Sequence, residues 1–218
     1  MRGMKSFLGW WKSDYDFRTV AAASGSLAVT AVFALYNGFL GVYHSSLWHG
    51  TICVYYLVLA ILRGVIVSAS IQSARESDPV RFQRKFYTAA AALLLFLNIC
   101  LIVPVSLMAV RAKPVNLTLI PAIAMAAYTT YKVIMASVNL RRRKRSPNRL
   151  LHLLRAIGFI DALVSILSLQ NTLIMVNMRE ESTEMLALTA ATSAAVMLAV
   201  LAISAVAMGK GIAARKDS

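Results

Sequence analysis

Six long runs of apolar residues, separated by short polar segments, make up most of the chain. A transmembrane helix needs about 20 mostly apolar residues, because an α-helix rises about 1.5 Å per residue and the hydrocarbon layer is about 30 Å thick. The pattern therefore predicts an all-α, polytopic membrane protein, a bundle of six transmembrane helices. The expected spans cover about residues 19–43, 47–71, 86–110, 115–139, 150–176 and 185–208.

Shorter segments flank the expected six-helix domain of residues 19–208. Residues 1–18 mix aromatic and basic side chains, a composition typical of an amphipathic segment that lies at the lipid headgroups. Residues 209–218 carry the last basic residues and are expected to form a cytoplasmic tail. Inside the third span, Pro104 has no N–H to donate, so it should kink the helix or remove one backbone hydrogen bond.

Charge and composition agree with this architecture. The chain is 59% hydrophobic with a net charge of +14, and its mean hydropathy is +0.66. Such a charge invites comparison with nucleic-acid-binding proteins, but here the basic residues stand in short blocks between apolar runs. Seventeen of them fall in the N-terminal segment, the second and fourth connections and the C-terminal tail, against three in the other connections. The positive-inside rule therefore predicts that both termini are cytoplasmic.

One basic block stands out between the fourth and fifth spans. Lys and Arg clusters next to a membrane attract anionic lipid, which is sufficient to explain the block as an anchor of orientation. A phosphorylated ligand or a protein partner is the alternative. No nucleic-acid partner is expected. The residues concerned are Arg141, Arg142, Arg143, Lys144 and Arg145.

Four ionisable side chains fall inside the predicted spans, where each costs at least about 2.5–3.5 kcal/mol. From the helical rise, Arg63 and Lys132 should lie about 12 Å from the cytoplasmic boundary and Arg155 about 8 Å. Asp161 should lie near the middle of the bilayer. Three cations against one carboxylate leave an excess of positive charge, which an anionic solute or headgroup would balance. The alternative is a purely structural network, with long basic side chains extended toward the headgroups and Asp161 paired with one of them.

The polar residues of the spans fall on stripes, which should face the interior of the bundle because lipid cannot satisfy them. Tyr56 shares a helix face with Arg63, and Tyr128 shares one with Lys132. Asn37 in the first span and Asn98 in the third are expected to point inward as well. The sixth span has no charge, and its alanines suit close helix packing or contact with a second copy or partner subunit: Ala190, Ala191, Ala194, Ala195 and Ala199.

These features favour transport or binding of a small, preferably anionic, solute through the polar centre of the bundle. In this hypothesis the three cations attract the anion, Asp161 couples or gates its movement, and four residues line the route: Tyr56, Tyr128, Asn37 and Asn98. The first alternative is a substrate-capture subunit that works with a separate ATPase. The second is a structural or regulatory protein whose basic cytoplasmic loops bind lipid or protein.

Enzymatic functions find little support in the sequence. An intramembrane aspartyl protease needs two carboxylates, and only Asp161 lies in an expected span. The sequence contains no HExxH, Walker A, GxGxxG or GxSxG motif. We therefore expect neither catalytic residues nor a metal or cofactor.

Two further patterns are a possible internal repeat and a resemblance to known proteins. A weak echo at an offset of 92 residues aligns Leu62-Arg63 with Leu154-Arg155, but an inverted repeat would send these arginines to opposite membrane halves. Trp48, the run Tyr55-Tyr56-Leu57-x-Leu59-x-x-x-Arg63 and the run Ala127-Tyr128-Thr129-x-Tyr131-Lys132-x-x-Met135-Ala136 resemble a group of small six-span proteins of clostridia and related bacteria. This resemblance implies a multi-pass protein of a bacterial plasma (inner) membrane and implies no particular chemistry.

Overall fold

The computed structural model describes residues 15–73, 78–110, 119–141, 149–177 and 183–216, and nearly all of these are α-helical. The helices follow one another without a strand in the described part of the chain, as an all-α fold requires. In order they are α2 (Tyr15–Tyr43), α3 (Leu47–Ser73), α4 (Pro79–Cys100), α5 (Ile102–Val110), α6 (Leu119–Arg141), α7 (Arg149–Asn177) and α8 (Thr183–Lys216).

Five helical stretches are long and apolar enough to cross a membrane, so the chain is a multi-pass membrane protein. They are Ser24–Tyr43, Leu47–Ser73, Val80–Ser106, Arg149–Ile174 and Ala187–Ala213. The expected fourth span is represented by α6, whose apolar part, Ala122–Val138, is shorter than the other five.

Helix boundaries differ from the expected ones at both ends of the chain. α2 begins at Tyr15, four residues before the expected span, and residues 1–14 of the expected interfacial segment lie outside the described residues. α8 continues to Lys216, so residues 209–216 of the expected cytoplasmic tail are helical and continuous with the sixth span. Of the basic block, Arg141 ends α6 and residues 142–145 lie outside the described part.

The helix of the third span is divided into two segments just before Pro104, which agrees with the irregularity that this proline predicts. α4 begins after Asp78, whose carboxylate accepts a hydrogen bond from the Arg81 backbone N–H, and it ends at Cys100, four residues before Pro104. A proline ring collides with the carbonyl of the residue four positions earlier and offers no N–H to it. The chain resumes helically as α5 after Leu101, which keeps a right-handed helical conformation, so the two segments form one continuous span.

A tight turn joins α2 and α3 into a hairpin. Ser45 takes the left-handed conformation, with φ of 49°, and Ser46 N–H donates to the Gly41 carbonyl. A Cβ added to Gly41 would lie 2.9 Å from the backbone nitrogen of Gly50. The absence of a side chain at Gly41 therefore lets the two helices approach closely.

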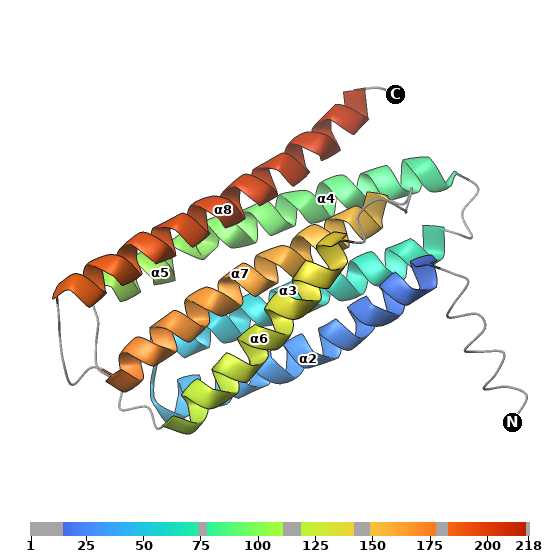
Figure 1. Ribbon diagram of the computed structural model, residues 1–218. Coiled ribbons are helices and arrows are strands. Elements are labelled where there is room, and N and C mark those ends of the chain that lie inside the picture. The colour runs from blue at the N-terminus through green and yellow to red at the C-terminus, as the bar shows by residue number, and fades with distance from the viewer. Residues whose placement is uncertain (1–14, 74–77, 111–118, 142–148, 178–182, 217–218) are drawn as a thin grey trace, which may run out of the picture.

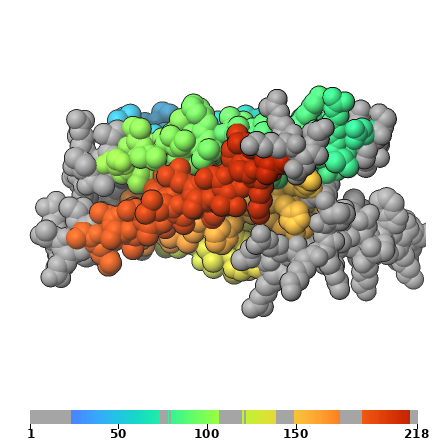
Figure 2. All heavy atoms as spheres, turned by 90° about the horizontal axis from the view of Figure 1, so that it is seen from above, coloured from blue at the N-terminus to red at the C-terminus, as the bar shows by residue number. Residues whose placement is uncertain are grey.

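The helices run side by side, and α7 lies at the centre of the bundle, in contact with α2, α3, α4, α6 and α8 (Figure 1). α6 crosses α7 on one side (Figure 1), while α8 runs along α4 on the other, which the space-filling view also shows (Figure 2). The start of α2 and the end of α8 lie at the same end of the bundle (Figure 1). A chain that crosses a membrane an even number of times has this property.

The interior combines an apolar core with the polar stripes expected from the sequence, and the outside is apolar. Large hydrophobic side chains such as Val42, Leu47 and Ile120 are mostly exposed, which suits a surface that faces lipid. The alanines of the sixth span make no close packing inside the described bundle, and contact through them with a second copy or partner subunit stays a prediction. They lie on the exposed side of α8, whose buried residues are Ser193, Met197, Val200, Ser204 and Ala207.

Candidate binding site in the bundle

Two cations and one carboxylate meet in the interior of the bundle. The Arg63 Nη2 atom lies 2.8 Å from Asp161 Oδ2, and the Lys132 ammonium binds the same oxygen. Asp161 is fully buried, and Arg63 and Lys132 are each 3% exposed. Arg63 and Lys132 therefore do not extend toward the headgroups, and the pairing with Asp161 that the structural alternative also expects is formed.

A hydroxyl group of α2 completes the site. Thr30 Oγ1 accepts hydrogen bonds from Lys132 Nζ and from Arg63 Nη1, at 3.3 Å, and donates its own hydrogen to the Ser26 carbonyl, at 2.8 Å. Two donors and two acceptors thus form a closed ring, Arg63–Asp161–Lys132–Thr30. We call these four residues the charged ring. It joins four helices: α2, α3, α6 and α7.

Helical spacing explains how four helices deliver these groups to one place. Residues seven apart lie almost above one another on a helix, and α3 carries His49, Tyr56, Arg63 and Ser70 on one buried stripe. Asp161 lies on the buried face of α7, one turn from Gly158. A Cβ at Gly158 would stand 3.9 Å from Arg63 Nη2, an ordinary van der Waals contact, so the guanidinium lies directly beside this glycine.

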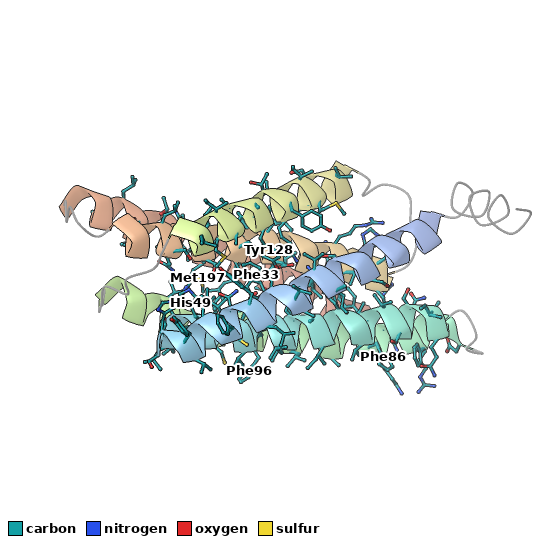
Figure 3. All side chains as sticks on the ribbon, turned by 90° about the horizontal axis from the view of Figure 1, so that it is seen from below. Phe33, His49, Phe86, Phe96, Tyr128 and Met197 are labelled. Atoms are coloured by element: carbon teal, nitrogen blue, oxygen red, sulfur yellow. The ribbon has the colours of Figure 1, made fainter. Side chains whose placement is uncertain are left out.

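An aromatic layer lies next to the charged ring. The rings of Phe33 and Tyr128 stack with centroids 3.6 Å apart, and Tyr56 meets both edge-on, at 5.8 Å and 6.1 Å. The Lys132 ammonium lies 5.1 Å from the centroid of the Tyr128 ring, within the range of a cation–π contact. Phe33 and Tyr128 face each other inside the bundle, whereas Phe86 and Phe96 point outward (Figure 3).

Ser165 connects the aromatic layer to α7. Its hydroxyl donates to the Asp161 carbonyl at 2.7 Å, so the Tyr56 hydroxyl, at 3.2 Å from Ser165 Oγ, acts as the donor to it. Thr129 donates to the Ser165 carbonyl at 3.1 Å. These bonds fix Tyr56 and the aromatic layer relative to the carboxylate.

The two asparagines lie inside the bundle but at different places. Asn37 is fully buried one level beyond the aromatic layer, and its amide donates to the Phe33 carbonyl at 2.9 Å. Asn98 is also fully buried, but it links Tyr55 to Ser204, at 3.0 Å and 2.7 Å, between α3, α4 and α8. Asn98 therefore belongs to a separate contact, and its expected place along the route of a solute is not supported.

Arg155 stands apart from the charged ring. It lies six residues before Asp161, which places it about 9 Å along α7 and about 120° around its axis. Its side chain is half-buried. The structure thus brings together Arg63, Lys132 and Asp161 of the four expected ionisable residues.

Three further residues belong to this site although the sequence analysis did not predict them as ligand-binding residues: Thr30, Ser26 and Phe33. Arg63 Nη1 donates to Ser26 Oγ at 2.9 Å as well as to Thr30. The spacing of Ser26 and Thr30 on one face of the first span was the available signal. The sequence contains no comparable signal for Phe33, because an aromatic residue in a transmembrane span usually belongs to the hydrophobic core.

The chemistry available here is the binding of negative charge. With both cations charged and Asp161 ionised, the charged ring carries one net positive charge in a buried place. Only one oxygen of the carboxylate is used, since Asp161 Oδ1 has no hydrogen-bond partner among the described residues. A buried excess charge of this kind is expensive unless an anion neutralises it.

The sequence was compared with known protein families and with curated proteins. No family model matches it, and no curated protein is significantly similar.

Proposed function

We propose that this protein binds a small anion at the charged ring and lets it pass through the bundle. The observation that supports this most is that Arg63 and Lys132 share a single oxygen of Asp161. Coulombic repulsion between two buried cations is several kcal/mol at an effective dielectric constant near 20. The excess positive charge that one carboxylate leaves would attract a monoanion, and the aromatic layer beside the ring would gate the path.

The proposal includes six spans with both termini in the cytoplasm. α6 has 23 residues, a length of about 34 Å, which is sufficient to cross the hydrocarbon layer. The distribution of Lys and Arg supports the cytoplasmic position of the termini. The resemblance of the Trp48 and Tyr55–Arg63 segments to small clostridial proteins supports a bacterial plasma membrane.

Chemical rescue tests whether the site accepts an anion. Asp161→Ala removes the carboxylate and leaves room for formate, which has the same functional group. We expect this variant to melt at a lower temperature than the unaltered protein in detergent, and sodium formate to restore much of the difference. Sodium chloride at equal ionic strength controls for screening.

Asp78→Ala is the matched control, because it removes an exposed carboxylate that caps α4. Formate should not rescue this variant, since a solvated cap holds no buried excess charge. If formate fails to stabilise Asp161→Ala and also the unaltered protein, the charged ring is closed to anions. The structural alternative, a network that only fastens α2, α3, α6 and α7 together, would then hold.

A further inference from the structure

The inference concerns which ion moves together with the anion, and it rests on the proposed function. Asp161 is the ionisable acid of the charged ring. The charged and titratable groups around it are Arg63, Tyr55 and Tyr56 from α3, and Lys132 and Tyr128 from α6. α2 contributes only the hydroxyls of Ser26 and Thr30. Tyrosine ordinarily titrates near 10 and arginine stays charged, so Asp161 and Lys132 are the groups able to change charge.

The carboxylate has one oxygen for the cations and one for a proton. Oδ2 accepts from both Arg63 and Lys132, whereas Oδ1 is buried and has no hydrogen-bond partner among the described residues. A proton that binds Oδ1 converts the carboxylate into a carboxylic acid and leaves Oδ2 as an acceptor. Both cations can therefore stay in place while the net charge of the ring rises from one to two.

We propose that the anion site is proton-coupled: Asp161 takes up a proton when an anion binds, so that one proton and one monoanion enter the site together. The reason is electrostatic, since a ring with two excess charges attracts an anion more strongly than a ring with one. Linkage is reciprocal, so if the proton raises the affinity for the anion, the anion raises the affinity for the proton by the same factor. The combined species is electrically neutral.

Buried polar atoms also lie beyond the ring toward the α2–α3 turn, and in this proposal the proton enters from that side. Asn37 and Ser168 lie seven residues beyond Thr30 and Asp161 on their helices, about 10 Å along the axis. His49 lies seven residues beyond Tyr56 on the stripe of α3, and its Nδ1 contacts Ser46 Oγ at 3.0 Å. Asn37 Oδ1, Ser168 Oγ and His49 Nε2 are buried and have no hydrogen-bond partner among the described residues. Buried polar groups of this kind are ordinarily satisfied by ordered water, which relays protons.

Formate is a suitable probe because it stays fully ionised between pH 6 and 8. Its affinity for the detergent-solubilised protein is measured from the rise in melting temperature with concentration. We expect the affinity to increase as the pH falls, by up to about tenfold per pH unit where one proton is coupled. In Asp161→Asn, which resembles the protonated acid, the affinity should lose the pH dependence that Asp161 contributes. Asp78→Asn, at an exposed acid outside the bundle, should keep the pH dependence of the unaltered protein.

A second measurement uses the unaltered protein and needs no variant. In a weakly buffered detergent solution with a pH indicator, added formate should cause uptake of up to one proton per site. If formate binds with a pH-independent affinity and no proton uptake, the coupling is refuted and the anion site stands. If proton uptake persists in Asp161→Asn, another group carries the proton and the assignment to Asp161 is overturned. If formate stabilises neither the unaltered protein nor Asp161→Ala, the anion site itself fails and the coupling with it.

Discussion

Thr30 accepts hydrogen bonds from both cations of the charged ring, although threonine carries no charge. Thr30→Val keeps the shape of the side chain and removes the oxygen, so Arg63 and Lys132 each lose an acceptor in a buried place. We expect a loss of about 1–3 kcal/mol in the free energy of unfolding, the usual cost of leaving buried donors unsatisfied. Denaturant unfolding in detergent measures it.

Thr130→Val is the control for that substitution. Thr130 is exposed and its hydroxyl donates to the Ala126 carbonyl four residues earlier, as the Thr30 hydroxyl donates to Ser26. It contacts neither cation of the charged ring. Equal losses in the two variants would show that the backbone bond of threonine, rather than the bonds from the cations, accounts for the effect.

Asp161→Asn leaves two buried cations without their carboxylate. Removal of one partner from a buried ion pair costs about 3–5 kcal/mol, so the melting temperature in detergent should fall well below that of the unaltered protein. The double variant Asp161→Asn/Lys132→Met restores one net charge and should be more stable than Asp161→Asn alone. Losses that simply add would mean that Lys132 and Asp161 are not energetically coupled.

Asp78→Asn is the control for Asp161→Asn, because it also removes a carboxylate. Asp78 caps α4 at an exposed position, and asparagine caps a helix about as well as aspartate. Its stability should be nearly unchanged.

The close approach of α2 and α3 in their hairpin depends on Gly41. Gly41→Ala would place a Cβ 2.9 Å from the Gly50 nitrogen, and because the obstacle is backbone, the helices must separate. We expect lower thermal stability in detergent. Gly25→Ala on the same helix meets nothing within 4 Å, so it should be neutral or slightly stabilising, since alanine is the better helix former. Equal stability of the two variants would contradict this account.

At the level of elements, the sequence predicts most of what the structure contains. Apolar length defines the helices, Pro104 locates the break between α4 and α5, and periodicity places Tyr56, Arg63 and Asp161 on buried faces. Boundaries shift because helices continue beyond the hydrocarbon layer wherever polar residues still favour helix, as at the end of α8. The alanines of α8 lie on its exposed side, and small residues suit either a protein or a lipid neighbour, so their partner cannot be read from the sequence.

The site itself is only partly predictable, because it depends on which helices are neighbours. The predicted depths in the membrane place Arg63, Lys132 and Arg155 together. On α7, however, Arg155 points in a different direction around the helix axis from Asp161. α7 contacts both α3 and α6, which do not contact each other closely along their backbones in the described residues. Their long side chains reach across to Asp161 from two sides, and no pattern within one helix reveals such an arrangement.

At the level of the whole molecule, the orientation in the membrane is directly testable. In a variant with Cys53 and Cys100 replaced, a cysteine at exposed Ser45 should react with an impermeant maleimide on intact cells. A cysteine at Ser146 should react only after permeabilisation, which also controls for its reactivity. Ser46 is less suitable as an external site because it is 8% exposed. The reverse labelling pattern would invert the predicted topology.

The order of the charged ring along the chain has a consequence for biosynthesis. Arg63 and Lys132 lie on α3 and α6, whereas their carboxylate lies on α7, which is made after both. A nascent chain must therefore hold two unneutralised cations within or beside the bilayer until Asp161 leaves the ribosome. During that interval we expect the early helices to remain with the insertion machinery, because lipid offers these cations no counter-ion. Arrival of α7 then releases them, so completion of the ion pairs marks the point at which the newborn protein becomes stable in the membrane.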